Sequence, residues 1–347
     1  MNDQPAALRI AHVMAGAANG GAELFYERLC IAQHEQGLNI LPIIRKNSER
    51  YQLLSSVGLK PLELPFGGKM DWTTGRKIGQ ALKQFAPRVS IAWMNRAAQF
   101  MPVGDWVSVG RLGGFYDLKY YKNCDHLVGN TKGIVKWLKE QGWPEDRAHY
   151  VPNFARDFPN VTPKRPEYIP VNAPFLLALG RLHKNKGFDV LIKAMTMLKD
   201  VHLLIAGEGE ERANLENLVR SLDIADRVHM PGWVHDISQV LGACDVLVCS
   251  SRHEPLGNVV LEGFAATKPV VSMASQGPVE LITQEHNGLL SPLEDDVLLA
   301  QSIQKLLDQP EFSQKIATAG RQKFEQEFSK QTVLQAWLSF LNTVEKV

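Results

Sequence analysis

Two glutamates bracket a glycine turn in the stretch Glu254-Pro255-Leu256-Gly257-Asn258-Val259-Val260-Leu261-Glu262. The apolar run 244–249 before it predicts a buried strand, and residues 259–266 have a helical pattern. At Gly257 the backbone can approach a ligand closely. A helix that starts beside a strand end offers unpaired N–H groups and a positive dipole end to an anion. The stretch therefore predicts a parallel α/β sheet with a phosphate site at its edge.

The glutamates themselves indicate that hydroxyl groups are recognised on both sides of that phosphate site. A carboxylate repels phosphate, but it accepts hydrogen bonds from hydroxyls. Glu254 lies in the loop and Glu262 inside the following helix. A nucleotide sugar carries hydroxyls on each side of its diphosphate, so we expect such a molecule between the two carboxylates.

A cationic motif follows another predicted strand, at 175–179. It reads Gly180-Arg181-Leu182-His183-Lys184-Asn185-Lys186-Gly187. Arg181 can bind two phosphate oxygens with its fork of N–H groups, and Lys186 adds a point charge. Taken alone, such a pair is more often a solvated loop feature. Because the carboxyl ends of parallel strands meet at one edge of a sheet, we expect the motif beside the glutamates.

Composition is that of a globular protein with two domains of ordinary size. The chain has 347 residues, of which 45% are hydrophobic and 22% charged. No apolar run approaches the ~18 to 20 residues that span a bilayer. Residues 1–5 lack the basic and apolar segments of a signal peptide, and the four cysteines form no CxxC pair. We expect a cytoplasmic protein with reduced thiols.

Strand and helix patterns alternate in both halves, which predicts parallel sheets covered by helices. Predicted strands lie at 8–14, 40–44, 89–93, 106–109, 175–179 and 201–206, and predicted helices at 23–36, 187–198 and 212–222. Five prolines between 159 and 174 predict a linker. We therefore expect two Rossmann-like domains around a central cleft, 1–168 and 169–329, and a terminal amphipathic helix, 330–347. That helix can dock on the second domain or cross back to the first, and we expect the latter.

Charge is unevenly distributed. Residues 1–170 hold 22 Lys and Arg against 15 Asp and Glu, a net of +7, and the remainder holds 16 against 22, a net of −6. Basic and aromatic residues also mix at 119–122 and 132–139. These features suit a phosphorylated saccharide, a glycolipid or an anionic membrane surface, and equally a solvated surface. We do not expect a nucleic-acid partner.

The motifs together resemble the retaining glycosyltransferases of the GT-B fold, in the group 1 family (family four), over essentially the whole chain. The residues that carry the resemblance are Gly20-Gly21-Ala22-Glu23, Gly180-Arg181-Leu182 with Lys186-Gly187, Ala206-Gly207-Glu208-Gly209, Glu254 with Gly257 and Glu262, Gly277 with Glu280, and Asn287-Gly288-Leu289-Leu290. The stretch 111–130 is similar to enzymes that build lipopolysaccharide or other surface polysaccharide. The resemblance implies transfer of a sugar from a nucleotide diphosphate sugar to a saccharide or glycolipid acceptor.

Roles for individual residues follow from that resemblance. Arg181 and Lys186 would bind the diphosphate, and the cationic pair together with Glu254 would form the catalytic group. Glu254 would contact the donor sugar and Glu262 the ribose. The remaining implied donor-binding residues are Gly20, Gly21, Gly207, Val234, Gly257, Asn258 and Val259. Near Trp233 and Val234 the family reads the base largely through backbone, and the sequence leaves UDP, GDP and ADP open.

The chain departs from the family pattern in its first half. A His-Asp pair is often found there after a strand, but here 109–117 contains no histidine, and His126 falls in the next predicted strand. Arg111 or the turn at 113–114 is the candidate replacement. No Asp-x-Asp motif or Cys/His cluster with ligand spacing is present, so we expect no cofactor and no metal.

Three other interpretations compete. The first is a dehydrogenase, because residues 207–212 partly match the glycine fingerprint of dinucleotide-binding proteins. Arg212, however, stands where the third glycine of that fingerprint belongs. A nucleotide-sugar epimerase shares the GT-B architecture, yet it needs first-domain carboxylates that the sequence does not reveal. A non-catalytic nucleotide-sugar-binding protein would keep the binding motifs without turnover.

Overall fold

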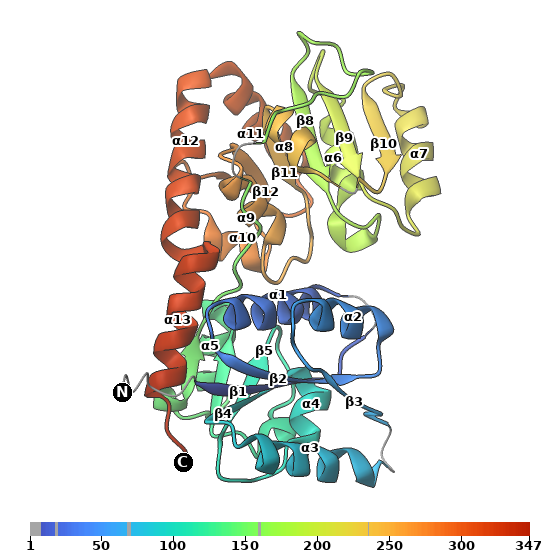
Figure 1. The fold of residues 1–347 in the computed structure, drawn as a ribbon. Helices are drawn as coiled ribbons and strands as arrows, with labels where there is room; N and C mark the ends of the chain where they lie inside the picture. Colours follow the sequence, from blue (N-terminus) through green and yellow to red (C-terminus); the bar gives the residue numbers. More distant parts are fainter. Residues whose placement is uncertain (1–7, 18–19, 68–70, 159–160, 235) are drawn as a thin grey trace. The chain divides into compact units, whose positions relative to one another are not determined.

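The computed structural model describes residues 8–17, 20–67, 71–158, 161–234 and 236–347. These form two compact units, Met1–Asn153 with Val333–Val347, and Phe154–Thr332 (Figure 1). Residues 154–168, which the sequence assigns to the first domain, are tied to the second unit: Ala155 N–H donates to the Phe328 carbonyl and Lys164 N–H to that of Gln239. Of the linker prolines, Pro159 lies outside the described residues.

The first unit is a seven-stranded parallel sheet in the order β3-β2-β1-β4-β5-β6-β7. Its strands are β1 Arg9–Met14, β2 Asn39–Arg45, β3 Leu62–Leu64, β4 Val89–Trp93, β5 Val107–Leu112, β6 His126–Gly129 and β7 Ala148–Tyr150. Its helices are α1 Gly21–Glu35, α2 Ser48–Ser56, α3 Trp72–Phe85, α4 Met94–Phe100 and α5 Lys132–Glu140. Strands β4 and β5 are buried along their whole length, as expected for central parallel strands covered on both faces.

The second unit repeats this plan with six parallel strands in the order β10-β9-β8-β11-β12-β13. They are β8 Phe175–Leu179, β9 His202–Ala206, β10 Val228–Gly232, β11 Val246–Cys249, β12 Val270–Met273 and β13 Leu289–Ser291. The helices are α6 Phe188–Ala194, α7 Arg212–Ser221, α8 Ser238–Ala243, α9 Asn258–Ala265, α10 Gln276–Leu281, α11 Asp296–Asp308 and α12 Pro310–Lys323. The predicted fold class, two Rossmann-like α/β domains, is confirmed.

Strand order places a ligand edge in each sheet. The chain direction across the sheet reverses between β1 and β4 in the first unit and between β8 and β11 in the second. Open α/β sheets bind ligands at the carboxyl ends of the strands beside such a reversal. The cationic motif follows β8 and the glutamate motif follows β11, so both lie at the reversal of the second sheet.

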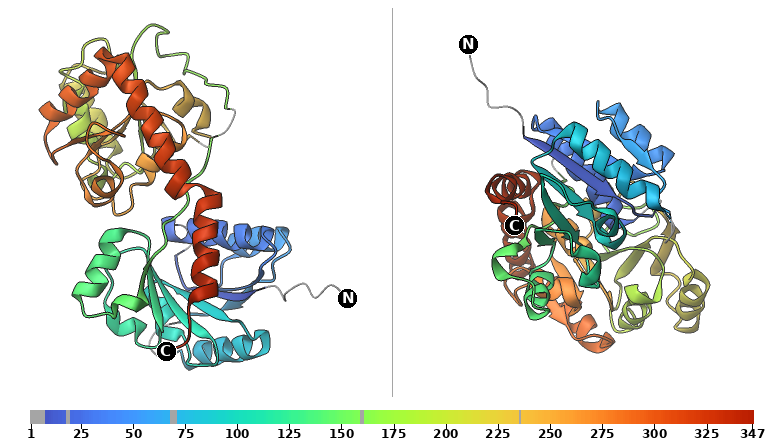
Figure 2. Two further views of the ribbon diagram at one scale, coloured as in Figure 1. Left: turned by 90° about the vertical axis from the view of Figure 1, so that its left-hand side faces the viewer. Right: turned by 90° about the horizontal axis from the view of Figure 1, so that it is seen from below.

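The last helix, α13 Lys330–Thr343, returns to the first unit, which confirms the expected crossing (Figure 2). Its apolar stripe is buried, and Trp337 has no exposed surface. Arg88 fixes the end of the helix by donating hydrogen bonds to the carbonyls of Leu341 at 3.1 Å and of Asn342 and Val344 at 3.0 Å. His126 Nε2 adds a contact of 2.7 Å to the Glu345 carbonyl.

Acid should loosen this attachment. Because a carbonyl only accepts, His126 donates to Glu345 through Nε2 and accepts from His149 through Nδ1, at 3.0 Å. Burial, and then the neighbouring His126, lower the pKa of His149 from 6.5 to about 4. In the unfolded chain His149 therefore binds a proton below pH 6.5, whereas in the folded unit it does so only below about pH 4. The free energy of unfolding is unaffected by this group above pH 6.5 and decreases as the pH falls from 6.5 to about 4.

Urea denaturation at about pH 7 and about pH 4.5 measures the effect. His149→Gln keeps a donor for His126 but has no titrating ring, so it should lose less free energy of unfolding over this range than the wild type. An identical loss in both proteins would assign the acid sensitivity to other groups.

Candidate functional site

A pocket of about 250 Å³ lies at the carboxyl edge of the second sheet. It is lined by Leu179, Gly180, Lys186, Ala206, Trp233, Val234, Ile237, Asn258, Val259 and Glu262. Five of these residues, Lys186, Val234, Asn258, Val259 and Glu262, were singled out from the sequence as donor-binding. The structure thus brings together residues from the ends of β8 and β9, from the segments after β8 and β10, and from α9, at the reversal of the strand order.

One wall of the pocket is the start of α9, which has the geometry of an anion site. Gly257 precedes the helix with a φ of 80°, and no side chain caps the N-terminus. A Cβ at Gly257 would lie 2.6 Å from Leu281 Cδ1, so a larger residue would be both strained and crowded. The N–H groups of Asn258 and Val259 have no partner within the helix, as at any helix start. They are therefore available to an anion in the pocket.

Lys186 and Glu254 form an ion pair beside the start of α9, with Nζ 2.6 Å from Oε2. The Glu254 side chain is 9% exposed and that of Lys186 is 24% exposed. Glu254 Oε1 also accepts a hydrogen bond of 3.3 Å from Gly257 N–H, and Oε2 one of 3.5 Å from the Ser251 hydroxyl. Glu254 is thus fixed from three directions, while Lys186 also lines the pocket.

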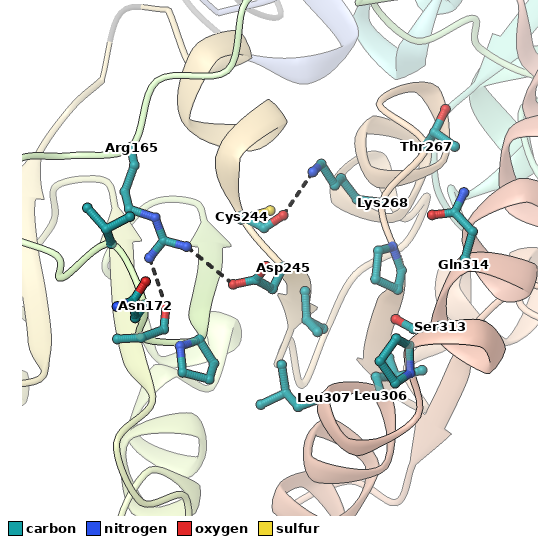
Figure 3. A pocket seen from close by; sticks show the side chains of 16 residues that line it. Arg165, Asn172, Cys244, Asp245, Thr267, Lys268, Leu306, Leu307, Ser313 and Gln314 are labelled. Atoms are coloured by element: carbon teal, nitrogen blue, oxygen red, sulfur yellow. Dashed lines mark hydrogen bonds and ion pairs between the residues drawn. The ribbon is translucent and has the colours of Figure 1, made fainter.

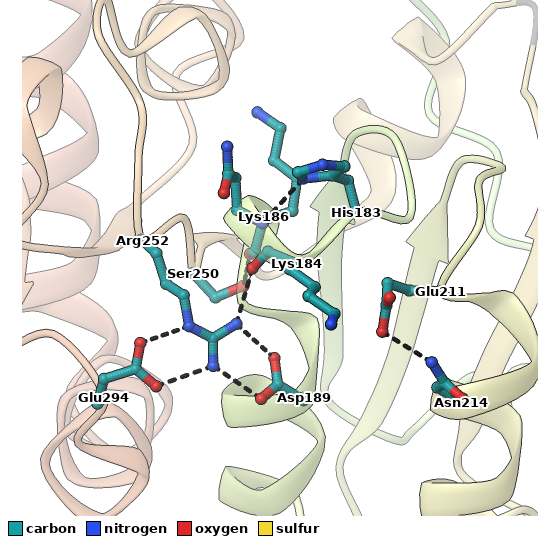
Figure 4. Close-up of polar contacts among 10 residues, drawn as sticks. His183, Lys184, Lys186, Asp189, Glu211, Asn214, Ser250, Arg252 and Glu294 are labelled. Atoms are coloured by element: carbon teal, nitrogen blue, oxygen red, sulfur yellow. Dashed lines mark hydrogen bonds and ion pairs between the residues drawn. The ribbon is translucent and has the colours of Figure 1, made fainter.

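The loops that carry this pair are tied to one another. The Ser250 hydroxyl donates to the Lys186 carbonyl at 2.8 Å, and Arg252 N–H donates to the Asn185 carbonyl at 2.8 Å. The Arg252 guanidinium lies between Asp189 and Glu294 (Figure 4). Hydrogen bonds from Arg252 to these two carboxylates raise its pKa, so it remains charged. Arg252 holds the loop geometry that the ion pair requires.

Arg181 does not line the pocket in this structure. Its side chain is 67% exposed and pairs with Glu210, with 2.9 Å between Nη2 and Oε2. An exposed pair of this kind contributes little to stability, because water and salt screen it. The arginine can therefore exchange Glu210 for another anion at little cost. Its assignment to the diphosphate stays a prediction.

Gly207 supports the pocket from behind. Its N–H donates to the Gly232 carbonyl at 2.9 Å, and a Cβ there would lie 1.8 Å from the Gly180 carbonyl oxygen. Only glycine lets the loops after β8 and β9 approach this closely. This close packing explains why position 207 needs glycine, without any contact to a ligand.

In the first unit, the loop after β1 is arranged around Glu23. Its carboxylate is buried, and Oε1 accepts a hydrogen bond of 2.7 Å from Ala17 N–H. A Cβ at Gly16 or Gly20 would lie 2.2 or 2.3 Å from the Glu23 oxygens, whereas Gly21 has open space around it. Gly20 thus makes room for Glu23. A donor contact for Gly20 and Gly21 stays a prediction, and Asn19 lies outside the described residues.

Arg111 occupies the end of β5, where the family often has histidine. It is 2% exposed and donates hydrogen bonds to the Leu112 carbonyl and to Asn153. Its guanidinium also lies 5.8 Å from the centre of the Phe25 ring and 5.6 Å from that of Trp93. Burial lowers the pKa of Arg111 to about 9, so it is still protonated at neutral pH. Within the described ranges, no carboxylate pairs with it.

A larger hollow, of about 480 Å³, lies at the opposite, amino-terminal edge of the second sheet (Figure 3). Its two cations bind within the chain: Arg165 Nη2 is 3.5 Å from Asp245, and Lys268 donates to the Cys244 carbonyl at 2.9 Å. Ligands of parallel α/β sheets bind at the carboxyl edge. The smaller pocket is therefore the candidate site.

Sequence patterns missed several residues that shape this site. Ile237 lies in a loop without periodicity, and Glu210, the partner of Arg181, is 29 residues away in the chain. Arg252 gave no signal because its partners, Asp189 and Glu294, are distant in sequence. Across the described part of the chain, no group of three or more His, Cys, Asp or Glu side chains could hold a metal ion.

Two parallel-sheet units with an anion pocket at one reversal define a two-domain α/β protein of the GT-B class. Residues 162–323 match the family described as glycosyl transferases group 1. The chain is 32% identical over 344 residues to the lipopolysaccharide core biosynthesis glycosyltransferase LpsD of Rhizobium meliloti (strain 1021), covering 96% of this chain and 98% of that protein. It is also 32% identical over 348 residues to LpsE of the same organism, with coverages of 96% and 99%. The chain belongs to the group 1 glycosyltransferase family and is a glycosyltransferase.

Solved structures support the fold. A glycosyltransferase from Rickettsia africae superposes with a TM-score of 0.86 at 19% identity, covering 97% of this chain and 98% of that one. Anabaena HepE in complex with UDP gives a TM-score of 0.84 at 19% identity, with coverages of 97% and 100%. At this identity the likeness concerns the fold, and it confirms GT-B.

Different consequences are expected for the two glutamates. Glu262 lines the pocket, so Glu262→Gln should weaken binding of the free nucleoside diphosphate by about 1.5–3 kcal/mol, the contribution of a hydrogen bond to a charged group. Glu254 does not line the pocket and is predicted to serve the transferred sugar, so Glu254→Gln should leave that affinity nearly intact and lower kcat.

Calorimetry with the nucleoside diphosphate and steady-state kinetics separate these effects. Asp308→Asn, on the exposed surface of the same unit, serves as the matched control. Equal loss of nucleotide affinity in the two glutamate variants would refute the division of roles.

Proposed function

We propose that this glycosyltransferase moves a sugar from a nucleotide diphosphate sugar to a saccharide or glycolipid acceptor. The single observation that carries the proposal is the composition of one pocket. It combines the uncapped start of α9 and Lys186 with Glu262 and with an apolar end at Val234 and Ile237. These groups complement a diphosphate, a ribose and a base. Solved neighbours crystallised with UDP and with UDP-glucose support such a donor.

We further propose that transfer retains the anomeric configuration, as the family resemblance implies. The bond between the anomeric carbon and the diphosphate oxygen breaks, and the acceptor hydroxyl oxygen forms its bond on the same face. The proton of that hydroxyl passes to a phosphate oxygen of the leaving diphosphate. This path needs no carboxylate nucleophile, unlike that of two-carboxylate glycosidases.

Cationic groups of the chain would stabilise the leaving diphosphate. Lys186 and the α9 start are already at the pocket, and Arg181 is held only by an exposed pair. Such preorganised positive groups lower the barrier where negative charge develops. We propose that no metal ion is needed. We also propose that the transferred group is a hexose.

The acceptor is proposed to be an intermediate of lipopolysaccharide or another surface polysaccharide. Two relatives that span nearly the full chain are described as lipopolysaccharide core biosynthesis glycosyltransferases, which supports this acceptor class. Neither is an epimerase or a binding protein, so these alternatives gain no support from them.

A panel of donors tests the function. Thermal unfolding with UDP-, GDP- and ADP-sugars should show one class that stabilises the protein, by about 2.7 kcal/mol at a concentration 100 times the Kd. The stabilising donor should be turned over with a lipopolysaccharide core acceptor, and Arg181→Ala should reduce that rate with a loss of ~2 to 4 kcal/mol.

Turnover in EDTA should match turnover without it. Stabilisation by no donor would overturn the proposal. Stabilisation without transfer to any acceptor would favour a binding protein, and loss of transfer in EDTA that Mg²⁺ restores would overturn the metal-free mechanism.

We propose that the first unit meets the acceptor and associates peripherally with an anionic membrane surface, on its cytoplasmic side. Support comes from the charge of residues 1–153, which hold 19 Lys and Arg against 13 Asp and Glu, a net of +6, and from an exposed aromatic, Phe115, in edge contact with Trp137 at 5.6 Å. Part of the basic character is neutralised locally, because Lys136 and Lys139 pair with Glu140 and Glu145. No helix among the described residues is long and apolar enough to cross a membrane.

Co-sedimentation with vesicles tests the association. Each Lys or Arg near an anionic bilayer contributes ~1 kcal/mol, so the wild type should bind anionic vesicles at low salt and release them at high salt. The triple variant Lys132→Glu, Lys136→Glu, Lys139→Glu should lose binding. Equal sedimentation with neutral and anionic vesicles would reject an anionic membrane surface as the partner and leave the transferase assignment unchanged.

A further inference from the structure

The second unit has another pocket, of about 400 Å³, between α6 and α7. This α6–α7 pocket is lined by His183, Lys184, Phe188, Asp189, Glu211, Asn214, Leu215, Leu218 and Arg252. Among the described residues, it shares no lining residue with the pocket at the carboxyl edge of the sheet. Its volume falls in the range of small-molecule sites, roughly 300 to 1,000 Å³. The proposed transfer reaction gives this pocket no ligand.

Hydrogen bonds hold the polar side chains of the α6–α7 pocket in place. Asp189 accepts two hydrogen bonds of 2.7 Å from the Arg252 guanidinium, and Glu211 accepts one of 3.0 Å from the Asn214 amide. Arg252 also donates to the Lys184 carbonyl at 2.8 Å (Figure 4). A site whose side chains are already ordered loses less conformational entropy when it binds a ligand.

The charges of the α6–α7 pocket are balanced, which disfavours an ionic ligand. Two cations, Lys184 and Arg252, oppose two carboxylates, Asp189 and Glu211. The Lys184 side chain runs between the carboxylates, and its ammonium makes no ion pair or hydrogen bond within the described ranges (Figure 4). An anion attracted by Lys184 would also meet Glu211, and a cation attracted by Glu211 would meet Lys184. A neutral ligand avoids both repulsions.

The lining groups complement the hydroxyls and the apolar face of a sugar ring. A hydroxyl both donates and accepts, so one ligand can donate to Glu211 and accept from Lys184. Apolar side chains line another part of the pocket, at Phe188, Leu215 and Leu218. The C–H groups on one face of a pyranose can cover them. Small-molecule sites commonly combine an apolar wall with a few placed polar groups of this kind.

We propose that the α6–α7 pocket is an accessory site for a neutral saccharide, separate from the site of transfer. The proposal goes beyond the proposed function, because neither the donor nor the reacting hydroxyl of the acceptor binds there. The turn Lys184–Lys186 contributes to both pockets, with Lys186 at the carboxyl edge and Lys184 in the α6–α7 pocket. A saccharide chain held at this second point rebinds as an intramolecular step, which raises its effective concentration at the enzyme.

Saturation-transfer NMR on the full chain tests the accessory site. The neutral probes are D-glucose, D-galactose, D-mannose and lactose, and inorganic phosphate is the anionic comparison. At least one saccharide should bind, and it should still bind when a saturating nucleoside diphosphate fills the pocket at the carboxyl edge. Inorganic phosphate should not displace it, because the lining charges are balanced.

Two exposed asparagines of α7 give a matched pair of variants, since Asn214 lines the pocket and Asn217 does not. Loss of a neutral hydrogen bond weakens binding by roughly 2-fold to 13-fold, so Asn214→Ala should bind the saccharide that much less tightly. Asn217→Ala should bind it like the wild type. Glu211→Ala removes a charged acceptor and should weaken binding by roughly 10-fold to 150-fold. Turnover of the donor by Asn214→Ala should match that of the wild type.

Each contrary outcome overturns the accessory site. Absence of binding by all four saccharides would do so directly. Equal saccharide affinity of Asn214→Ala and Asn217→Ala would assign the binding to another surface. Displacement of the saccharide by inorganic phosphate would show that Lys184 selects an anion instead. None of these results alters donor binding or transfer, so the proposed function would remain to be judged by its own experiments.

Discussion

The start of α9 has no capping side chain, and the ion pair of Lys186 with Glu254 and the pocket at the carboxyl edge of the second sheet lie beside it. Gly257 holds a backbone conformation that other residues rarely adopt, and the first helical residues after it, Asn258 and Val259, line the pocket. In this structure the charge of Lys186 is balanced by Glu254, which also receives the Gly257 N–H. The carboxylate thus holds the cation and the N-cap N–H, while the N–H groups of Asn258 and Val259 keep no partner within the helix. Binding of an anion there would therefore not require the loop to be rebuilt.

Rigidity of the two motif loops follows from the same constraint. A point charge is useful to a leaving group only if it is already in position when charge develops. The hydroxyl of Ser250 and the guanidinium of Arg252 join the loop after β8 to the loop after β11. Lys186 and Glu254 are therefore held close to one another by their backbones. Arg181 lies outside this framework and keeps an exposed partner. The pocket thus contains one fixed cation, Lys186, while Arg181 lies outside it in an exposed pair.

The sequence predicted what local patterns and parallel-sheet geometry determine. Gly257 and Glu262 lie within one strand-turn-helix unit, and Lys186 meets Glu254 because parallel strands end at the same edge. Strand β5 runs to Leu112, although the predicted strand ended at 109. The prediction stopped early because Arg111 interrupts the apolar run, yet the sheet buries this residue with the rest of the strand. The ion pair of Arg181 with Glu210 and the exposure of Trp233 could not be predicted from the sequence. Side-chain conformations at the surface and irregular loops do not produce a periodic sequence pattern.

Arg111 shows why net charge overstates what a surface offers to a partner. It counts toward the +7 of residues 1–170, yet its guanidinium is buried against a carbonyl, an amide and two aromatic rings. Guanidinium tolerates such a site because it is weakly hydrated and its charge is delocalised. With Lys136 and Lys139 paired to neighbouring carboxylates, fewer cations reach the surface than composition implies. Any attraction of the first unit to an anionic surface must then depend on the placement of a few residues and fall quickly with salt.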